Sequence, residues 1–130
     1  IISDNPIGSP IVDRPDVAVV LNGPSFEKYD PLVLPGGLLA VNSSIVEQDS
    51  TRTDIDIITI AANEIAEEMG SSKMMNMAML GAVLARRPVL ELAALEQALI
   101  DHLPASKAHL LESNLRVLQH GFVVGDTILV

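Results

Sequence analysis

The sequence predicts an α/β domain, with a three-layer, Rossmann-like arrangement, a mainly parallel sheet and a helical C-terminal half. Three short apolar runs in the first half are rich in β-branched residues and closed by turn residues, a pattern typical of strands buried on both faces. The second half instead carries leucines at helical spacing. With two Phe and one Tyr in 130 residues, the core must consist of aliphatic side chains, and we expect one domain.

The first half is expected to alternate strands with turns. Residues 1–12 contain Pro6 and Pro10, and we expect them to form the end of a hairpin or an edge strand. A short helix over residues 25–34, disturbed by Pro31, follows the first strand. A tight turn at residues 35–37 precedes the second strand, and a polar loop at residues 49–54 precedes the third. The expected strands are residues 17–21, 38–41 and 55–60.

Four helices are expected in the second half. Asn63 is the expected N-cap of the first, which Gly70 ends, and Ser72 is the expected N-cap of the second. Gly121 is expected to end the last helix, and a strand or extended tail should follow it. The expected helices are residues 63–69, 73–87, 90–103 and 106–120.

Composition excludes several classes of function. A net charge of −9 repels a phosphate backbone, so nucleic acid is not an expected partner. The longest apolar stretch of the helical half is shorter than the ~20 residues that a membrane span needs. The absence of cysteine excludes disulfides and a cysteine-ligated iron–sulfur cluster within this sequence. Because no leader opens the chain, we expect a cytoplasmic location.

An ordered set of motifs carries a family resemblance. Asn76-Met77-Ala78-Met79-Leu80-Gly81-Ala82 lies between residues 62–70 and two later motifs, at 95–99 and 114–122. Gly8-Ser9-Pro10, residues 15–21 and residues 35–42 precede it. Together these motifs resemble the gamma subunit or domain of pyruvate-type 2-oxoacid:ferredoxin oxidoreductases. The family's Gly-Gly-Gln-Gly-type loop has no match here, so we expect a glycine-rich N-terminal segment to be missing; Ala61 also stands where the family commonly has proline.

The resemblance implies an accessory role in a cytoplasmic complex. Such complexes oxidatively decarboxylate a 2-oxoacid to acyl-CoA and pass the electrons to ferredoxin. They use thiamine diphosphate, Mg²⁺, iron–sulfur clusters and coenzyme A, held mainly by the other subunits, so we expect this chain to hold no cofactor. The implied partners are alpha and beta subunits, with a delta subunit as an open alternative. The resemblance does not define the 2-oxoacid.

Candidate binding residues follow from the strand ends, because open α/β sheets bind ligands beyond the carboxyl ends of their strands. We expect contacts with coenzyme A or with a subunit interface, although turn chemistry alone would also select such residues. No pair of residues suits catalysis and no cluster suits a metal. The candidates are Asn22, Gly23, Ser25, Asn42, Ser43 and Asn76.

Other polar and sulfur-containing residues have simpler explanations. We interpret Gly125-Asp126-Thr127 as a turn, His120 as a cation at a helix C-terminus and the acidic residues near Asp49 as a solvated loop. The methionine-rich helix is expected in the core, with a subunit contact as the alternative. Two other functions stay open: a Rossmann-type nucleotide-dependent enzyme fragment, or a structural or regulatory dimerisation module.

Overall fold

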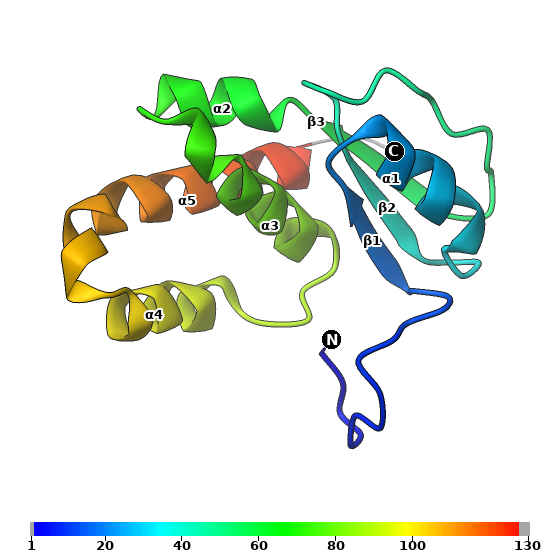
Figure 1. Ribbon diagram of the computed structural model, residues 1–130, viewed down its shortest axis with the longest axis horizontal. Coiled ribbons are helices and arrows are strands. Elements are labelled where there is room, and N and C mark those ends of the chain that lie inside the picture. Colours follow the sequence, from blue (N-terminus) through cyan, green and yellow to red (C-terminus); the bar gives the residue numbers. More distant parts are fainter. Residues whose placement is uncertain (1, 128–130) are drawn as a thin grey trace.

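The computed structural model describes residues 2–127, and a three-stranded parallel sheet lies at its centre (Figure 1). The strands are β1 (Val17–Val20), β2 (Leu38–Asn42) and β3 (Asp56–Ile60), in the spatial order β1-β2-β3. Because all three run in the same direction, their carboxyl ends meet at one edge of the sheet. The α/β class, the parallel sheet and the helical C-terminal half predicted from the sequence are confirmed.

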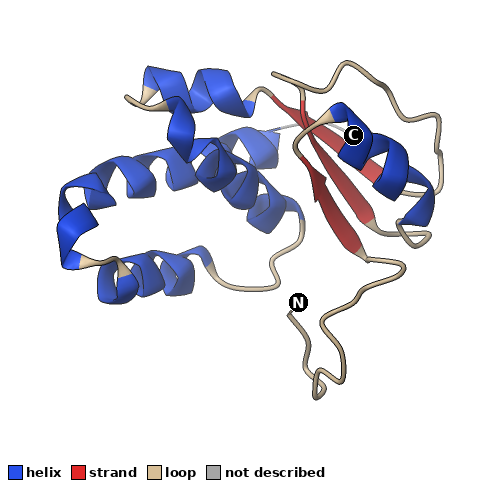
Figure 2. Ribbon diagram, viewed as in Figure 1, coloured by secondary structure: helices blue, strands red, loops and turns tan. Residues whose placement is uncertain are grey.

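Helices cover the two faces of the sheet unequally (Figure 2). Helix α1 (Gly23–Tyr29) and the short 3-10 helix η1 (Asp30–Leu32) lie on one face. The opposite face carries α2 (Ala62–Glu68), α3 (Met75–Arg86) and α5 (Leu111–Thr127). Two further 3-10 helices and α4 complete the described chain: η2 (Ser72–Met74), α4 (Leu92–His102) and η3 (Ala105–Leu110).

The middle strand, β2, is buried at all five positions because it supplies side chains to both cores. Leu39 and Val41 point toward α1 and pack in a cluster with Phe26. Leu38 and Ala40 point the other way, into the cluster that contains Met79 and Val117. The alternation of side chains along a strand therefore explains why this run reads as continuously apolar.

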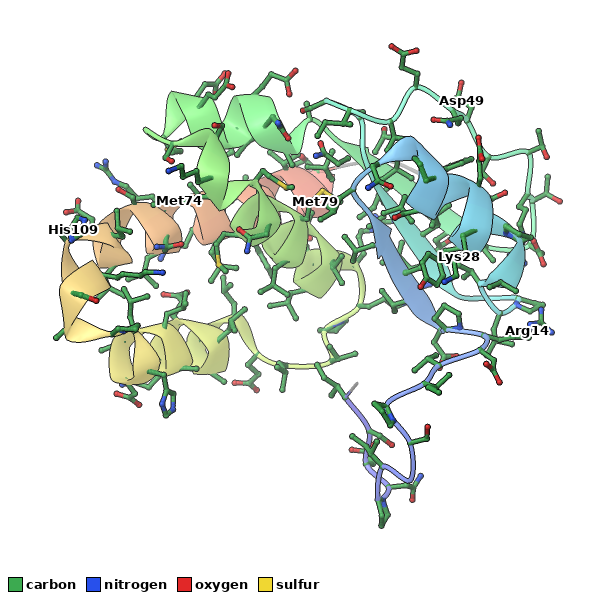
Figure 3. The ribbon with its side chains drawn as sticks, in the orientation of Figure 1. Arg14, Lys28, Asp49, Met74, Met79 and His109 are labelled. Carbon is green, nitrogen blue, oxygen red and sulfur yellow. The ribbon has the colours of Figure 1, made fainter. Side chains whose placement is uncertain are left out.

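Helices α3 and α5 pack with their backbones nearly in contact. A Cβ added at Gly81 would lie 2.1 Å from the carbonyl oxygen of Leu118, and one at Gly121 would lie 2.2 Å from that of Ala78. Gly125 faces Ala82 in the same way. Met79, from the methionine-rich helix, is 1% exposed and belongs to this core (Figure 3), as the sequence predicted for that helix.

Helix α3 spans the sheet from one edge to the other. Near its start, the Met75 sulfur lies 3.9 Å from the side-chain nitrogen of Asn42, at the carboxyl end of β2. Just past its last residue, Arg87 donates to the Asp56 carboxylate at 2.7 Å and to the Gly36 carbonyl at 3.2 Å, at the amino edge. Polar contacts at both ends therefore fix the helix across the sheet.

Several expected boundaries are wrong. Residues 2–12 form no strand. Asn63 lies inside α2 rather than capping it, and Ser71, not Ser72, accepts the first hydrogen bond of η2. Tertiary contacts explain why α2 needs no cap from Asn63, because side chains at the end of β2 satisfy its first backbone N–H groups. Asn42 accepts from Ala62, and Ser44 accepts from Asn63.

The C-terminal expectations are also wrong. Gly121 does not end a helix, since α5 continues to Thr127. His120 is therefore in the middle of a helix, and Gly125-Asp126-Thr127 is helical rather than a turn. Gly121 and Gly125 lie where α5 approaches the backbone of α3 closely. They leave room for that contact and do not form a turn. The remainder of the expected tail, residues 128–130, lies outside the described residues.

Candidate functional site at the carboxyl edge of the sheet

Four segments of the chain meet at the carboxyl edge of the sheet. They follow β1, β2 and β3, and the fourth is the start of α3. Asn42 pairs with Ile60 in the strand register, so the ends of β2 and β3 are adjacent. The six residues predicted from the sequence all lie in or beside these segments, although the structure gives them different roles.

Asn42 is fully buried, and its side chain joins three segments. Its Oδ1 accepts from the backbone N–H groups of Ser44 and Ala62, each at 3.2 Å. Its Nδ2 donates to Oδ1 of Asn63 at 2.9 Å and contacts the Met75 sulfur at 3.9 Å. All the hydrogen-bonding capacity of the amide is therefore used inside the protein. Asn42 holds the start of α2 and of α3 against the end of β2.

Ser44 continues this network toward the surface. Its hydroxyl accepts from the Asn63 backbone N–H at 3.1 Å and donates to the Glu64 carboxylate. That hydroxyl, together with hydrogen bonding to the backbone, lowers the pKa of Glu64 below its ordinary value. The charged carboxylate in the first turn of α2 also interacts favourably with the helix N-terminus.

Asn22 and Ser25 form the cap of α1 beside this network. The Asn22 Oδ1 accepts from the Ser25 backbone N–H at 2.9 Å, which is the usual geometry of an N-cap. Gly23 lies under the side chain of Gln48, whose Nε2 would be 2.9 Å from an added Cβ. Gln48 also contacts Glu27 at 3.5 Å, so the loop after β2 folds back over the start of α1.

Ser43 and Asn76 are exposed at this edge, as is the capping residue Asn22. The Ser43 backbone N–H donates to the Ile60 carbonyl at 2.9 Å, which leaves the side chain at the surface. Asn76 is exposed in the first turn of α3, and its Oδ1 accepts only from the Met77 backbone N–H at 3.0 Å among the described residues. The edge thus offers a hydroxyl and an amide to a partner beyond the strand ends.

Sequence reasoning missed the residues that organise this edge, which are Ser44, Gln48, Asn63 and Glu64. Asn63 was singled out only as a helix cap, although its side chain accepts from Asn42. The polar residues at 42–44 and 63–64 follow consecutive strands, and that signal could have paired them. Only the parallel register places the two groups side by side.

The residues at this edge carry amide, hydroxyl and carboxylate groups. Within residues 2–127, no group of three His, Cys, Asp or Glu side chains could hold a metal ion. No described helix is long and apolar enough to cross a membrane. Two surface hollows lie elsewhere, one of about 370 Å³ at Ile7–Pro10 and one of about 450 Å³ between Met69 and the Arg116–Val123 face of α5.

The family model described as pyruvate ferredoxin/flavodoxin oxidoreductase matches residues 1–124. The 2-oxoglutarate synthase subunit KorC of Methanocaldococcus jannaschii is 30% identical over 126 residues, which cover 95% of this chain and 66% of KorC. The ketoisovalerate oxidoreductase subunit VorA of Methanothermobacter thermautotrophicus is 32% identical over 125 residues, covering 93% of this chain and 25% of VorA. The chain thus spans just under two thirds of one relative and a quarter of the other.

Solved structures share the fold. The gamma subunit of a keto/oxoacid ferredoxin oxidoreductase from Geobacter sulfurreducens superposes with a TM-score of 0.81 at 24% identity, over 95% of this chain and 66% of that chain. The 2-oxoglutarate:ferredoxin oxidoreductase of Magnetococcus marinus, with 2-oxoglutarate, coenzyme A and succinyl-CoA bound, gives a TM-score of 0.76 at 22% identity, over 88% of this chain and 20% of that chain. At these identities the likeness establishes the arrangement of the elements.

Proposed function

Because this chain belongs to the pyruvate ferredoxin/flavodoxin oxidoreductase family, we propose that it is an accessory, gamma-type subunit or domain of a 2-oxoacid:ferredoxin oxidoreductase. The observation that carries the proposal is the family match across residues 1–124, nearly the whole chain. The complex would oxidatively decarboxylate a 2-oxoacid to acyl-CoA and reduce ferredoxin in the cytoplasm. Residues 1–130 would form a single domain of that assembly.

The proposed substrate class is a 2-oxoacid, without a commitment to pyruvate. One relative is a subunit of 2-oxoglutarate synthase and the other a subunit of ketoisovalerate oxidoreductase. These substrates differ in their side chains and share only the 2-oxoacid group. The other subunits would hold thiamine diphosphate, Mg²⁺ and the iron–sulfur clusters. Because those subunits would also bind the reacting carbon, they would select the 2-oxoacid.

The role proposed for this chain is assembly and contact with coenzyme A at the carboxyl edge of the sheet. Ser43 and Asn76 are exposed there, and Asn22, Gly23 and Ser25 form the adjoining turn. Amide and hydroxyl groups suit the amides and phosphates of coenzyme A. Asn42 would position this edge rather than contact the ligand, because its amide is fully occupied.

Reconstitution tests the proposed function. The full-length parent is co-expressed with its neighbouring subunits, and viologen reduction with coenzyme A is measured for a panel of 2-oxoacids, with and without this chain. Activity that requires the chain supports the gamma-type assignment, and the panel identifies the substrate. A chain that neither co-purifies nor changes the rate contradicts it, and NAD(P) binding or self-association would then support the Rossmann-type enzyme or the dimerisation module.

Paired substitutions test the coenzyme A contact. In the assembled complex, Ser43→Ala with Asn76→Ala should raise the KM for coenzyme A, while the KM for the 2-oxoacid stays unchanged. Both residues are exposed, so the fold should tolerate the change. Thr51→Ala with Gln97→Ala, at exposed positions away from this edge, provides the control. If both pairs of substitutions leave the KM for coenzyme A unchanged, the edge would contact another subunit and not coenzyme A.

A further inference from the structure

A strap, defined as residues 47–53, lies in the connection from β2 to β3 and contributes to neither core. Before it, Val46 belongs to the core cluster of α1 and donates to the Asn42 carbonyl at 2.9 Å. After it, the Asp54 carbonyl accepts from the Gly36 N–H at 2.7 Å. Because no strap residue belongs to either core cluster, polar contacts hold the strap on the body between these two fixed ends.

The strap follows α1 from its start to its end (Figure 1). At the start of the helix, the Gln48 side chain covers Gly23, and its Nε2 lies 3.5 Å from the Glu27 carboxylate. At the other end, the Ser50 hydroxyl donates to the carboxylate of Asp30, the C-cap of α1. The strap therefore touches both ends of this helix through side chains.

Arg52 makes the shortest contacts between the strap and the body. Its Nη1 donates to the carbonyl oxygens of Asp30 at 2.8 Å and Val33 at 2.6 Å, around η1. Its Nε and Nη2 donate to the two carboxylate oxygens of Asp54, at 2.8 Å and 2.7 Å. The bidentate pair orients the guanidinium group. The other two donors then satisfy carbonyl groups of the kind that a helix end leaves unpaired.

The two ends of the strap are held unequally. Gln48 contacts Glu27 at a distance beyond the usual range of a hydrogen bond, so this contact contributes little. Arg52 instead uses four of its five N–H groups at 2.6–2.8 Å. A lysine would keep the charge but could not make the bidentate pair and both carbonyl contacts together. The geometry of one guanidinium group therefore holds the strap against α1.

We propose that the strap opens as a unit about its fixed ends and that Arg52 is the latch that keeps it closed. A segment with few buried apolar contacts opens at a lower free energy than the whole protein unfolds. Opening would uncover Gly23 and the α1 side of the edge that we propose contacts coenzyme A. All the contacts of the latch lie within this chain, so the device does not depend on the proposed function.

Trypsin cleavage of the full-length parent tests the opening, because trypsin cuts after arginine and lysine. Cleavage after Arg52 should be about tenfold or more faster than cleavage after Arg86, at the end of the buried helix α3, since local opening needs less free energy than global unfolding. Low urea should change cleavage after Arg52 little. Cleavage after Arg86 should rise with the urea dependence of global unfolding.

Three variants test the latch. Arg52→Lys keeps the trypsin site and loses the guanidinium geometry, so cleavage after residue 52 should rise by about tenfold, relative to a matching synthetic peptide of residues 46–58. Arg116→Lys is the matched control, since Arg116 is exposed and lies 3.7 Å from its partner Glu112. It should leave cleavage after Arg52 unchanged. Gln48→Ala should change that cleavage by less than about twofold, because it removes only the long contact.

Three results would overturn the proposal. Equal rates and equal urea dependence after Arg52 and Arg86 would show that the strap opens only when the whole protein unfolds. No effect of Arg52→Lys would show that Arg52 is not the latch. A larger effect of Gln48→Ala than of Arg52→Lys would place the latch at the start of α1. Failure of the reconstitution would instead reject the gamma-type assignment and leave the result on the strap standing.

Discussion

At the scale of the residue, Asn42 is a buried polar side chain on β2 that accepts from the first backbone N–H of α2. It lies at the end of the central strand, and its amide satisfies the backbone N–H groups of Ser44 and Ala62. An unpaired buried N–H would cost free energy comparable to a lost hydrogen bond. The single amide therefore stabilises the two turns that form the edge proposed to contact coenzyme A.

Replacing Asn42 should destabilise the protein strongly. Asn42→Ala leaves the Ala62 and Ser44 N–H groups without their acceptor, so we expect a loss of about 2–3 kcal/mol in the free energy of unfolding. Asn76→Ala removes an exposed amide and should change it by less than about 0.5 kcal/mol. Urea unfolding followed by circular dichroism measures both. Similar values for the two variants would contradict the structural role of Asn42.

Glu64 gives the stability of the protein a dependence on pH. The Ser44 hydroxyl lowers the pKa of Glu64 in the folded state, so folding favours the ionised carboxylate. This contribution is fully present above the unfolded pKa, about 4.3 for Glu, and is lost as the pH falls through the lower, folded value. Glu64→Gln should therefore destabilise the protein at pH 6.5 and have a smaller effect near pH 3.

Asp54 provides a comparison for the same measurement. The hydrogen bond from Arg52, at 2.7–2.8 Å, lowers the pKa of Asp54, so this carboxylate contributes in the same direction. The contribution of Asp54 is the same in the wild type and in Glu64→Gln. It therefore cancels when the urea midpoints of the two proteins are compared at each pH. A difference between them that stays constant from pH 6.5 to pH 3 would show that Glu64 does not titrate with folding.

At the scale of the element, the contact between α3 and α5 depends on small residues. Gly81, Gly121 and Gly125 face Leu118, Ala78 and Ala82 at distances that leave no room for a Cβ. Glycine in a helix interior costs about 1 kcal/mol relative to alanine, so its presence here requires compensation from packing. The buried side chains beside this contact are Met79, Val83 and Leu84 of α3 and Val117 and Leu118 of α5.

Adding one methyl group should separate this pair of helices. Gly81→Ala should destabilise the protein by about 2–3 kcal/mol, although alanine favours a helix, because its Cβ would meet the Leu118 carbonyl. Gly8→Ala is the control, since nothing lies within 4 Å of a Cβ at that position. Thermal unfolding measures both changes. A stabilised Gly81→Ala variant would mean that the helices can move apart at little cost.

At the scale of the whole molecule, α4 lies outside the main body. It contains no buried residue, and its leucines at positions 92, 95 and 99 are only half-buried, as is Leu103 just after it. One polar contact to α5 joins Gln119 to Glu96 at 3.2 Å. In Figure 1 the helix runs apart from the sheet, beside the outer part of α5. Its stability therefore depends on few contacts.

Hydrogen exchange should resolve this difference. The amides of α4 should exchange through local opening, well before those of α3 and α5, because few buried apolar contacts hold them closed. The buried segments of α3 and α5 should exchange only with global unfolding, and their rates should follow the denaturant dependence of the whole protein. Equal protection of α4 and α3 in the isolated chain would show that α4 is integrated into the core.

The sequence by itself determined the class of fold and the place of most elements. Short β-branched runs identify the three strands, but the expected burial on both faces holds only for β2, since Val19 of β1 and Thr59 of β3 are exposed. Gly70 follows the end of α2 with a φ of +115°, a conformation that favours glycine. The candidates at the strand ends could be found because parallel strands end at one edge. These signals are local, since each depends on residues that are neighbours along the chain.

Only the tertiary structure decided which polar and small residues act together. The sequence alone suggested Asn63 and Gly121 as helix boundaries, because those residue types favour caps wherever they occur. Their observed roles depend on partners 21 and 43 positions earlier in the sequence, namely Asn42 and Ala78. A buried amide that replaces a local cap, and a glycine that admits a second helix, are set by contacts between distant segments. No local preference carries that information, and packing overrides local preference wherever the two compete.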